Sequence, residues 1–425
     1  MDKGHGGDFV NTVVLGAGIA GLAYASRAKG TVKVYEKNAA PGGLCGSFAK
    51  DGFTFNYGVH QSFTTIPEAR KFFDKTEYLC YGPHAANYYH GLVIPNPVIY
   101  NLYKIPEDVR IRLIESFRAR NKEIAVNNYA DWLRASYGEE IKSMFYDVYT
   151  KKYWTVTPDE MSVSWIGKRL TEPDLEKILS GAEKKSAEDN YYASEMRYPV
   201  QGGYASFLKP LTESADIVLG KEAVSIDPDS RSVTFADGMA VDYDKLASSV
   251  PLPVMAEIVR GVPEKVKQAA SRLKWTNLSI VSVAFNKPYA SDYVWDYVYD
   301  EDISTARISK PGIQSSSDVP AGKSSMQFEI YRGGKEKADE KEDVTSVISA
   351  VKRLGIAKKE DILFTDHKHL PYANIIFYNG MEEDRNVVRS YMESLGIRLI
   401  GRFGKWEYLW SDQSYMSGIN AAEEG

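Results

Sequence analysis

The sequence predicts an α/β protein in which a discontinuous Rossmann-like domain carries a helical insertion and a separate antiparallel or mixed β-sheet domain. Three observations predict this fold class. Residues 13–21 read VVLGAGIAG and are followed by VKVYEKN, which indicates a strand, a glycine-rich turn, a helix and a second strand. Residues 106–185 place apolar side chains three and four positions apart, as helices do. Residues 275–332 and 362–378 are rich in Val, Tyr, Phe and Ile, which suits the longer strands of another sheet.

The first strand–helix–strand unit has the pattern of a dinucleotide-binding site. Residues 13–15 read as a buried strand, and the N–H groups at the start of the following helix would hold phosphates. Residues 32–35 form the second strand, and Glu36 at its end can accept hydrogen bonds from a ribose diol. The turn permits a tight bend, a close approach of the pyrophosphate and close helix–strand packing through three glycines: Gly16, Gly18 and Gly21. We therefore expect a bound dinucleotide.

The next segment favours FAD over a nicotinamide dinucleotide. PGGL at residues 41–44 follows the ribose acid and precedes a strand-like stretch at residues 52–60. A glycine pair at this place lets the backbone approach the pyrophosphate and the ribityl chain without an intervening side chain. NAD-dependent Rossmann domains normally continue into another strand–helix unit. A third glycine pair at residues 202–203 and GRFG at residues 401–404 would complete the flavin site.

Composition limits the partners and the location that we expect. The formal net charge of -5 and the isoelectric point near 5.8 argue against a nucleic-acid partner. Only Cys45 and Cys80 occur, which supports neither a disulfide framework nor a metal site and fits a reducing cytoplasm. No apolar run approaches the roughly 18 residues of a membrane helix. We therefore expect no membrane span. Since the histidines show neither HxxxH nor HExxH spacing, we also expect no metal.

The remaining segments complete a three-part organisation. Residues 176–195 are polar and charged, which predicts an exposed, mobile loop at the end of the helical insertion. Residues 218–250 alternate strand with turn, PDS and ADG marking the turns, as a β-meander does. We expect a discontinuous FAD-binding domain formed by residues 1–90, 196–270 and 380–425. Residues 104–195 would form a helical domain with the mobile loop, and residues 271–379 a β-sheet substrate domain.

Six separated segments occur in the order in which one enzyme family has them. They are PGGL with the strand ending in YGVH, KKYWTVTPDEMSVSWIGKRLTEPDL, RYPVQGGY, YVYDEDISTARIS, HLPYANI and GRFGKWEYLWSDQSYMSGINAAEE. Together they resemble the UDP-galactopyranose mutases, which are flavoenzymes related to the flavin amine oxidases and the protoporphyrinogen oxidases. The resemblance runs from residue 10 to the C-terminus.

This resemblance implies roles for particular residues. Arg169 and Arg307 would be the two arginines that bind the substrate diphosphate, for which the planar fork of a guanidinium is well suited. His60 would be a hydrogen-bond partner for the N5 edge of the flavin. The implied substrate-binding residues are Trp165, Tyr372, Tyr408 and Asp412. The implied cofactor-binding residues are Gly16, Gly18, Gly21, Glu36, Lys37, Gly42, Gly43, Leu44, Gly401, Arg402 and Gly418.

The activity that the resemblance implies is interconversion of the pyranose and furanose forms of a nucleotide sugar, as between UDP-galactopyranose and UDP-galactofuranose. In such an isomerase the N5 of reduced FAD attacks the anomeric carbon and expels the nucleotide diphosphate, so that no protein nucleophile is required. The implied partners are a nucleotide-diphosphate sugar and an external reductant or NAD(P)H, in cell-surface polysaccharide biosynthesis. The sequence leaves the oligomeric state open, a homodimer included.

Two departures from the family pattern concern the substrate. Residues 92–101 carry Asn96, Val98 and Ile99 where some members have an aromatic-Pro-aromatic-Gln pattern that contacts the nucleobase, and the second histidine after His60 is missing. The main alternative is a FAD-dependent oxidoreductase of the amine-oxidase or protoporphyrinogen-oxidase type, which needs no paired phosphate arginines. The other is a flavoprotein without catalytic activity that binds a partner.

Overall fold

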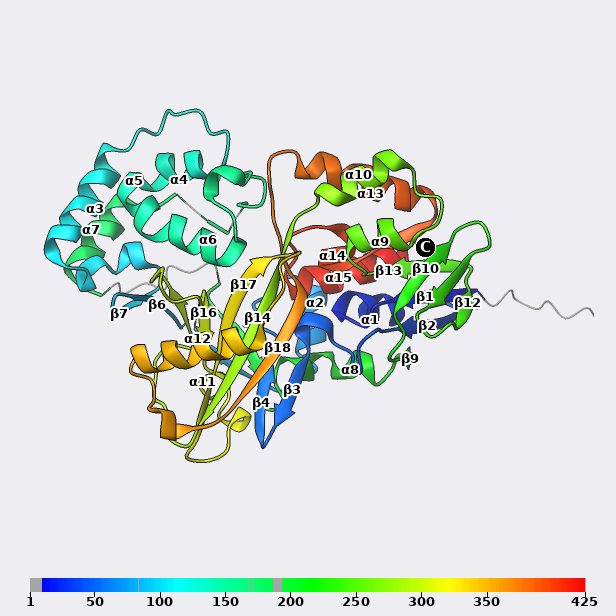
Figure 1. The fold of residues 1–425 in the computed structure, drawn as a ribbon, viewed down its shortest axis with the longest axis horizontal. Coiled ribbons are helices and arrows are strands. Elements are labelled where there is room, and N and C mark those ends of the chain that lie inside the picture. Colours follow the sequence, from blue (N-terminus) through cyan, green and yellow to red (C-terminus); the bar gives the residue numbers. More distant parts are fainter. Residues whose placement is uncertain (1–9, 83, 168, 171, 186–192, 425) are drawn as a thin grey trace, which may run out of the picture.

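The structure is a computed structural model that describes residues 10–82, 84–167, 169–170, 172–185 and 193–424. Three parts follow one another along the longest axis of the molecule: a group of helices, a long mixed sheet and a parallel sheet covered by helices (Figure 1). This arrangement confirms the predicted α/β fold class, with a Rossmann-like domain, a helical insertion and a separate mixed sheet.

The parallel sheet has five short strands that come from three distant stretches of the chain. All of its neighbouring strands pair in parallel, in the order β19–β13–β1–β2–β9. Their bounds are β1 (Asn11–Leu15), β2 (Thr31–Tyr35), β9 (Ile217–Val218), β13 (Lys245–Ser248) and β19 (Ile397–Leu399). Helix α1 (Ile19–Ala25) connects β1 to β2, which confirms the predicted first unit. Since β13 follows the helical insertion in sequence and β19 follows the last strand of the mixed sheet, the Rossmann-like domain is discontinuous.

The two faces of this sheet are covered by different elements because side chains alternate along a strand. Val13 and Leu15 pack in one apolar cluster with Phe235, and Val14 packs in the other with the residues of α1. The first face is covered by β10 (Ala223–Asp227), β11 (Ser232–Phe235), β12 (Ala240–Asp242), α9 (Leu252–Ile258), α10 (Glu264–Arg272) and α13 (Met381–Ser394). The second face is covered by α1, α2 (Pro67–Phe73), α8 (Lys209–Thr212) and α15 (Ser411–Glu423).

The mixed sheet has seven strands in the order β18–β14–β17–β16–β15–β6–β7, and all neighbours are antiparallel except β15 and β6. Their bounds are β6 (Ala85–Tyr89), β7 (Leu92–Pro95), β14 (Trp275–Phe285), β15 (Trp295–Val298), β16 (Arg307–Ser309), β17 (Ser324–Gly333) and β18 (Ile362–Ile375). Helix α12 (Glu340–Arg353) packs on it through Val347 and Val351. Strand β6 therefore belongs to this sheet, although the expected boundary assigned residues up to 90 to the cofactor domain.

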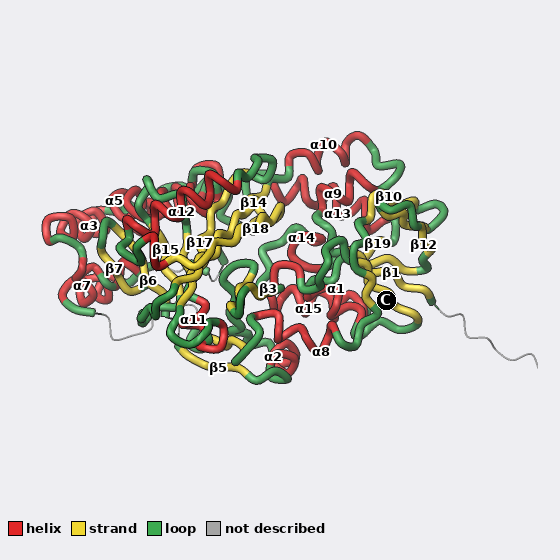
Figure 2. Tube along the Cα trace, turned by 60° about the horizontal axis from the view of Figure 1, so that its bottom comes forward, coloured by secondary structure: helices red, strands yellow, loops and turns green. Residues whose placement is uncertain are grey.

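The helical insertion forms one end of the molecule, and the mixed sheet lies between it and the parallel sheet (Figure 2). Its helices are α3 (Glu107–Ala119), α4 (Tyr129–Tyr137), α5 (Glu139–Ile141), α6 (Val148–Trp154) and α7 (Leu175–Glu183), with a π-helical turn at Lys142–Asp147. The expectation of an exposed loop from residue 176 is wrong for α7. Ile178 and Ala182 lie four positions apart on its buried face, and surrounding charges hid this short pattern. Residues 186–192 of the expected loop lie outside the described residues.

Shorter elements join the parts. The hairpin of β3 (Ser47–Lys50) and β4 (Phe53–Asn56) packs Phe53 and Phe55 edge-on against Phe364 of β18. The remaining elements are β5 (Tyr78–Tyr81), β8 (Met196–Pro199), α11 (Pro311–Gln314) and α14 (Gly401–Lys405). Within the described ranges, none of the helices is both long and apolar enough to cross a membrane.

The buried carboxyl of Asp318 makes the stability of this assembly depend on pH. It accepts a hydrogen bond from the Tyr198 hydroxyl at 2.7 Å. Burial raises the pKa of Asp318 to about 6, which hydrogen bonds from Tyr198 and the Gly203 N–H only partly oppose. Because the folded-state pKa lies above the value of about 4 in an unfolded chain, this group favours folding below pH ~4, and its contribution is lost as the pH rises through 6.

We therefore expect Asp318→Asn to remove a fall in the free energy of unfolding between pH 4 and 7. The measurement is denaturant unfolding of both proteins across this pH range, and the quantity compared is the difference between their free energies of unfolding at each pH. The comparison is needed because burial lowers the pKa of His60 to about 4, which gives the opposite dependence in both proteins. A difference that does not change with pH would contradict the assignment to Asp318.

Candidate functional site

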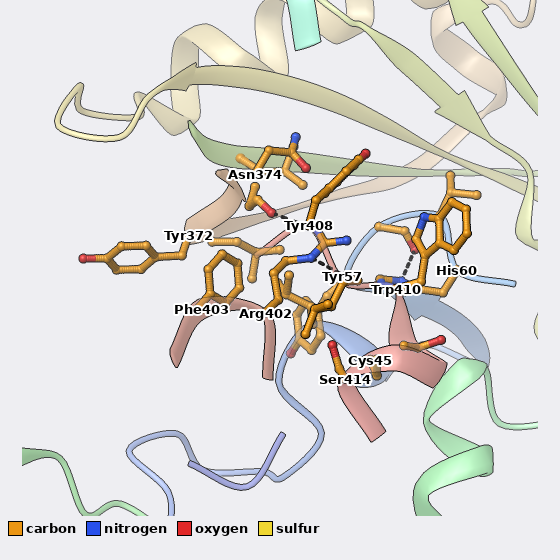
Figure 3. A pocket seen from close by; sticks show the side chains of 18 of the residues that line it. Cys45, Tyr57, His60, Tyr372, Asn374, Arg402, Phe403, Tyr408, Trp410 and Ser414 are labelled. Atoms are coloured by element: carbon orange, nitrogen blue, oxygen red, sulfur yellow. Dashed lines mark hydrogen bonds between the residues drawn. The ribbon is translucent and has the colours of Figure 1, made fainter. Parts of the chain in front are cut away.

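A large cavity of about 1550 Å³ extends from the glycine turns of the parallel sheet to the space between the mixed sheet and the helical insertion. The second cavity that we describe holds only about 240 Å³. Figure 3 shows side chains of the Rossmann-like domain and of the mixed sheet around the large cavity, with Tyr372, Phe403 and Arg402 on one side and His60 and Trp410 on the other. Residues of the helical insertion, among them Tyr149 and Trp165, also line it. The cavity is therefore the place where the parts meet.

Two glycine turns form the narrow end of this cavity. Gly42 donates its N–H to the Ala17 carbonyl at 2.8 Å and forms a bridge with Gly18, which holds the two turns together. A side chain on Gly18 would meet no atom within 4 Å, so the space in front of α1 is open. On Gly21 a Cβ would lie 2.0 Å from the Gly16 carbonyl oxygen, so that this glycine serves the packing of α1 on β1. The open space is where helix N–H groups can reach a phosphate.

Glu36 is buried at the end of β2 and its carboxylate is held in place. Oε2 accepts from the Ala17 N–H at 2.8 Å, and Oε1 accepts from the N–H and the side-chain amide of Asn38 at 2.9 and 2.6 Å. A carboxylate has about four acceptor sites, so capacity for a further donor such as a ribose hydroxyl remains. The carboxylate also faces the cavity. The predicted role of Glu36 thus fits its position.

Most of the other predicted cofactor residues also line the cavity, and Gly418 does not. Lys37, Gly42, Gly43, Leu44, Gly401 and Arg402 face it together with Gly16, Gly18 and Glu36. Gly418 lies in the contact of α15 with α1, where a Cβ would come within 2.2 Å of the Ala20 carbonyl oxygen. It therefore allows two helices to pack closely and does not contact the cavity. The open turn, the anchored acid and the glycine pair fit a dinucleotide such as FAD.

His60 is a neutral hydrogen-bond acceptor on the cavity side. Burial, aided by the charges of Arg307 and Arg402, lowers its pKa to about 4. Its Nδ1 lies 3.2 Å from the Gly58 carbonyl oxygen, and because a carbonyl only accepts, Nδ1 carries the proton. Nε2 is then the acceptor. The neighbouring Cys45 is a neutral thiol, because burial raises its pKa to about 12, so it is a poor nucleophile.

Arg169 lines the cavity from the segment that follows α6. It donates from Nη2 to the Tyr408 carbonyl at 2.6 Å and from Nη1 to the Trp165 carbonyl at 3.1 Å. Its guanidinium also lies over two rings, 4.4 Å from that of Tyr408 and 4.8 Å from that of Trp410. These contacts join the helical insertion to the segment before α15.

Arg307 enters the cavity from β16 in the mixed sheet and is bound by a carboxylate that the sequence analysis missed. Glu329 accepts from Arg307 Nε at 2.8 Å and from Nη2 at 3.0 Å. The attraction of Glu329 holds the pKa of Arg307 well above its ordinary value although burial opposes this. Sequence inspection could have found Glu329, because it is the one acidic residue of the stretch SSMQFEIYRG and lies between Phe328 and Ile330.

Aromatic side chains make up the walls between the two arginines. From the helical insertion come Tyr129, Tyr137, Tyr146, Tyr149, Tyr153, Trp154 and Trp165, and from the mixed sheet come Tyr297, Tyr299, Tyr331 and Tyr372. Burial raises the pKa of Tyr137 and of Tyr372 to about 12, so both hydroxyls remain protonated. The walls thus offer hydroxyl donors without adding charge.

Among the predicted substrate residues, Trp165, Tyr372 and Tyr408 line the cavity and Asp412 does not. Asp412 is buried in the first turn of α15, where it accepts from the Gln413 N–H at 2.9 Å. It stabilises the start of the helix. Over the described part of the chain, no group of three or more His, Cys, Asp or Glu side chains could hold a metal ion.

Comparisons with known proteins agree with this architecture. Residues 14–76 match the family model of NAD(P)-binding Rossmann-like domains. The structure resembles a reduced UDP-galactopyranose mutase with a TM-score of 0.90 and 24% identity, over 98% of this chain and 95% of that one. It resembles a provisionally assigned protoporphyrinogen oxidase from an Exiguobacterium species with a TM-score of 0.74 and 14% identity, over 98% of both chains. It also resembles an oxidoreductase from Methanosarcina mazei with a TM-score of 0.65 and 15% identity, over 97% of this chain and 100% of that one. The chain therefore has the fold of these proteins.

A pair of glycine variants distinguishes the cofactor site from the packing of the fold. We expect Gly18→Val to leave the melting temperature of cofactor-free protein nearly unchanged, because a Cβ at this position meets no atom within 4 Å and the backbone conformation is an ordinary one, φ -74°. It should lower the affinity for FAD at least about tenfold, since the side chain fills the space of the phosphates. Gly21→Ala should instead destabilise the fold, because its Cβ meets a backbone oxygen. Equal FAD affinity of Gly18→Val and the unaltered protein in a fluorescence titration would contradict the assignment.

Proposed function

We propose that this protein is a FAD-dependent isomerase that interconverts the pyranose and furanose forms of a nucleotide sugar, as UDP-galactopyranose mutases do. The observation that carries the proposal is that Arg169 and Arg307 line the same cavity, from the helical insertion and from the mixed sheet, and that this cavity is continuous with the dinucleotide site. Two guanidinium groups can bind the oxygens of a diphosphate. The similarity in fold to the mutase over nearly both chains supports the proposal.

The residues of the chain would bind and orient the substrate. When bound, reduced FAD supplies a nucleophilic nitrogen for attack on a sugar carbon. Arg169 and Arg307 would stabilise the negative charge of the departing diphosphate. The tyrosines would hydrogen bond the sugar and the phosphates, and the aromatic walls would exclude water. His60 would accept a hydrogen bond through Nε2 at the cofactor end of the cavity.

A FAD-dependent oxidoreductase is the second candidate, and one observation favours it. Glu329 offsets the charge of Arg307, and many aromatic side chains line the cavity beyond the cofactor site. Such a cavity would also suit an uncharged aromatic substrate or an amine, for which tyrosine rings provide stacking and cation–π contacts. The similarity in fold to a protein assigned as a protoporphyrinogen oxidase is in line with this alternative.

We expect the dithionite-reduced protein to interconvert a nucleotide-sugar pyranose and furanose, and the air-oxidised protein not to do so. Turnover is followed by chromatography with UDP-galactose, UDP-galactofuranose and other UDP-, TDP- and GDP-sugars. Arg307→Lys and Arg169→Lys should each lower kcat/KM about 10²-fold, since removal of one preorganised donor costs this much. Arg272→Lys is the matched control, because Arg272 pairs with Asp384 at a largely exposed position away from the cavity.

Two outcomes would contradict the isomerase. In the first, FAD-loaded reduced protein converts none of these sugars, and an amine or a porphyrinogen reduces its oxidised flavin. This result would support the oxidoreductase. In the second, the protein binds FAD but turns over neither class of substrate, which would support a flavoprotein without catalytic activity.

A further inference from the structure

A buried carboxylate that does not itself face the cavity connects several parts of its wall. Glu329 lies in the middle of β17, is fully buried, and is absent from the cavity lining. Its neighbours Arg307, Tyr331 and Val59 all line the cavity. Glu329 thus lies directly behind the wall, where it can act only through residues that it holds.

The two oxygens of Glu329 accept four hydrogen bonds. Arg307 donates from Nε at 2.8 Å and from Nη2 at 3.0 Å, the Tyr331 hydroxyl donates at 2.8 Å, and the Val59 N–H donates at 3.1 Å. A carboxylate has about four acceptor sites, so all of its capacity is used. The donors come from β16, from β17 and from the loop after β4 that carries His60. One carboxylate therefore fixes a cation, a hydroxyl and the backbone beside His60 relative to one another.

The shape of the guanidinium shows what this fixation does. Its donors form two edges that can each bind a pair of oxygens, one made by Nε and Nη2 and the other by Nη1 and Nη2. Glu329 takes the first edge of Arg307. The second edge lies outside the ion pair, and its direction is set because the guanidinium is planar and the carboxylate is held from three sides.

We propose that Glu329 is a positioning residue that directs the Nη1–Nη2 edge of Arg307 toward an anionic group of the substrate. The inference rests on the proposed function for the identity of the anion, a diphosphate. Its competitor is that Glu329 only offsets the charge of Arg307. The two ideas differ in sign: loss of an orienting partner weakens anion binding, whereas loss of an offsetting charge strengthens it.

Two variants and one control separate these ideas. Glu329→Gln keeps the shape but removes the charge, and Glu329→Asp keeps the charge but draws the carboxylate back from Arg307. The matched control is Asp296→Asn, since Asp296 of β15 binds buried Lys310 at 2.6 Å in the same sheet and neither residue lines the cavity. Each purified holoprotein is first compared in FAD content and melting temperature, so that unfolding is recognised.

The measurement is the affinity for UDP by isothermal titration calorimetry. We expect both Glu329 variants to bind UDP about tenfold more weakly, because a small misplacement of a positioned group costs one to two orders of magnitude, and Asp296→Asn to bind it unchanged. Glu329→Asp added to Arg307→Lys should weaken binding no further than Arg307→Lys alone, since Glu329 acts through Arg307. Unchanged or tighter binding of UDP by a folded Glu329→Asp protein would overturn the proposal.

If the unaltered protein binds no nucleoside diphosphate, the proposed function fails and the position of Arg307 can still be tested. Crystal structures of the unaltered protein and of Glu329→Asp then decide. The proposal expects the guanidinium to rotate away from its position in the unaltered protein. An unmoved guanidinium would show that the surrounding wall holds Arg307 without Glu329, and would overturn the inference.

Discussion

The close contact of two glycine turns is the constraint on which the rest of the site depends. Gly42 donates to the Ala17 carbonyl, and a Cβ on Gly43 would lie 3.4 Å from the Cα of Gly18. This contact leaves the N-terminal end of α1 open at the carboxyl end of the parallel strands, where α/β proteins bind ligands. It also fixes the start of β3 and β4, and with them the loop that carries His60.

The cost of burying charged side chains is the second constraint, and here Arg307 and Glu329 are buried as an ion pair. Glu329 has almost no exposed surface, and breaking a buried ion pair by removing one partner typically costs about 3–5 kcal/mol. Arg307 and Glu329 therefore depend on each other for stability as well as for position. Elsewhere the wall uses tyrosines, whose hydroxyls can hydrogen bond a polar ligand without the cost of a buried charge. The wall therefore offers many tyrosine hydroxyls beside its charged side chains.

The sequence predicted the parts that rest on local pattern. The turn after β1, the anchored Glu36 and the glycine pair at residues 42–43 follow from neighbouring residues, and the structure brings them together. The roles that the sequence alone did not reveal depend on contacts from distant segments. Gly418 looks like a cofactor glycine in sequence but packs α15 on Ala20. Glu329 gains its meaning only when β16 pairs with β17 at Arg307. Short α7 was missed because two buried positions among charges give too weak a periodicity.

Tyr408 connects the Rossmann-like domain to the helical insertion. Its ring lies 4.4 Å from the guanidinium of Arg169 and 5.1 Å from that of Arg402. Arg169 also binds the Tyr408 carbonyl, and Arg402 binds the next carbonyl, that of Leu409, at 2.8 Å. A guanidinium from each part thus holds the same short segment. Arg402 and Arg169 both line the cavity, one from the Rossmann-like domain and the other from the helical insertion. The segment at residues 408–409 therefore belongs to the support of both parts of the proposed site, because each guanidinium binds one of its carbonyls.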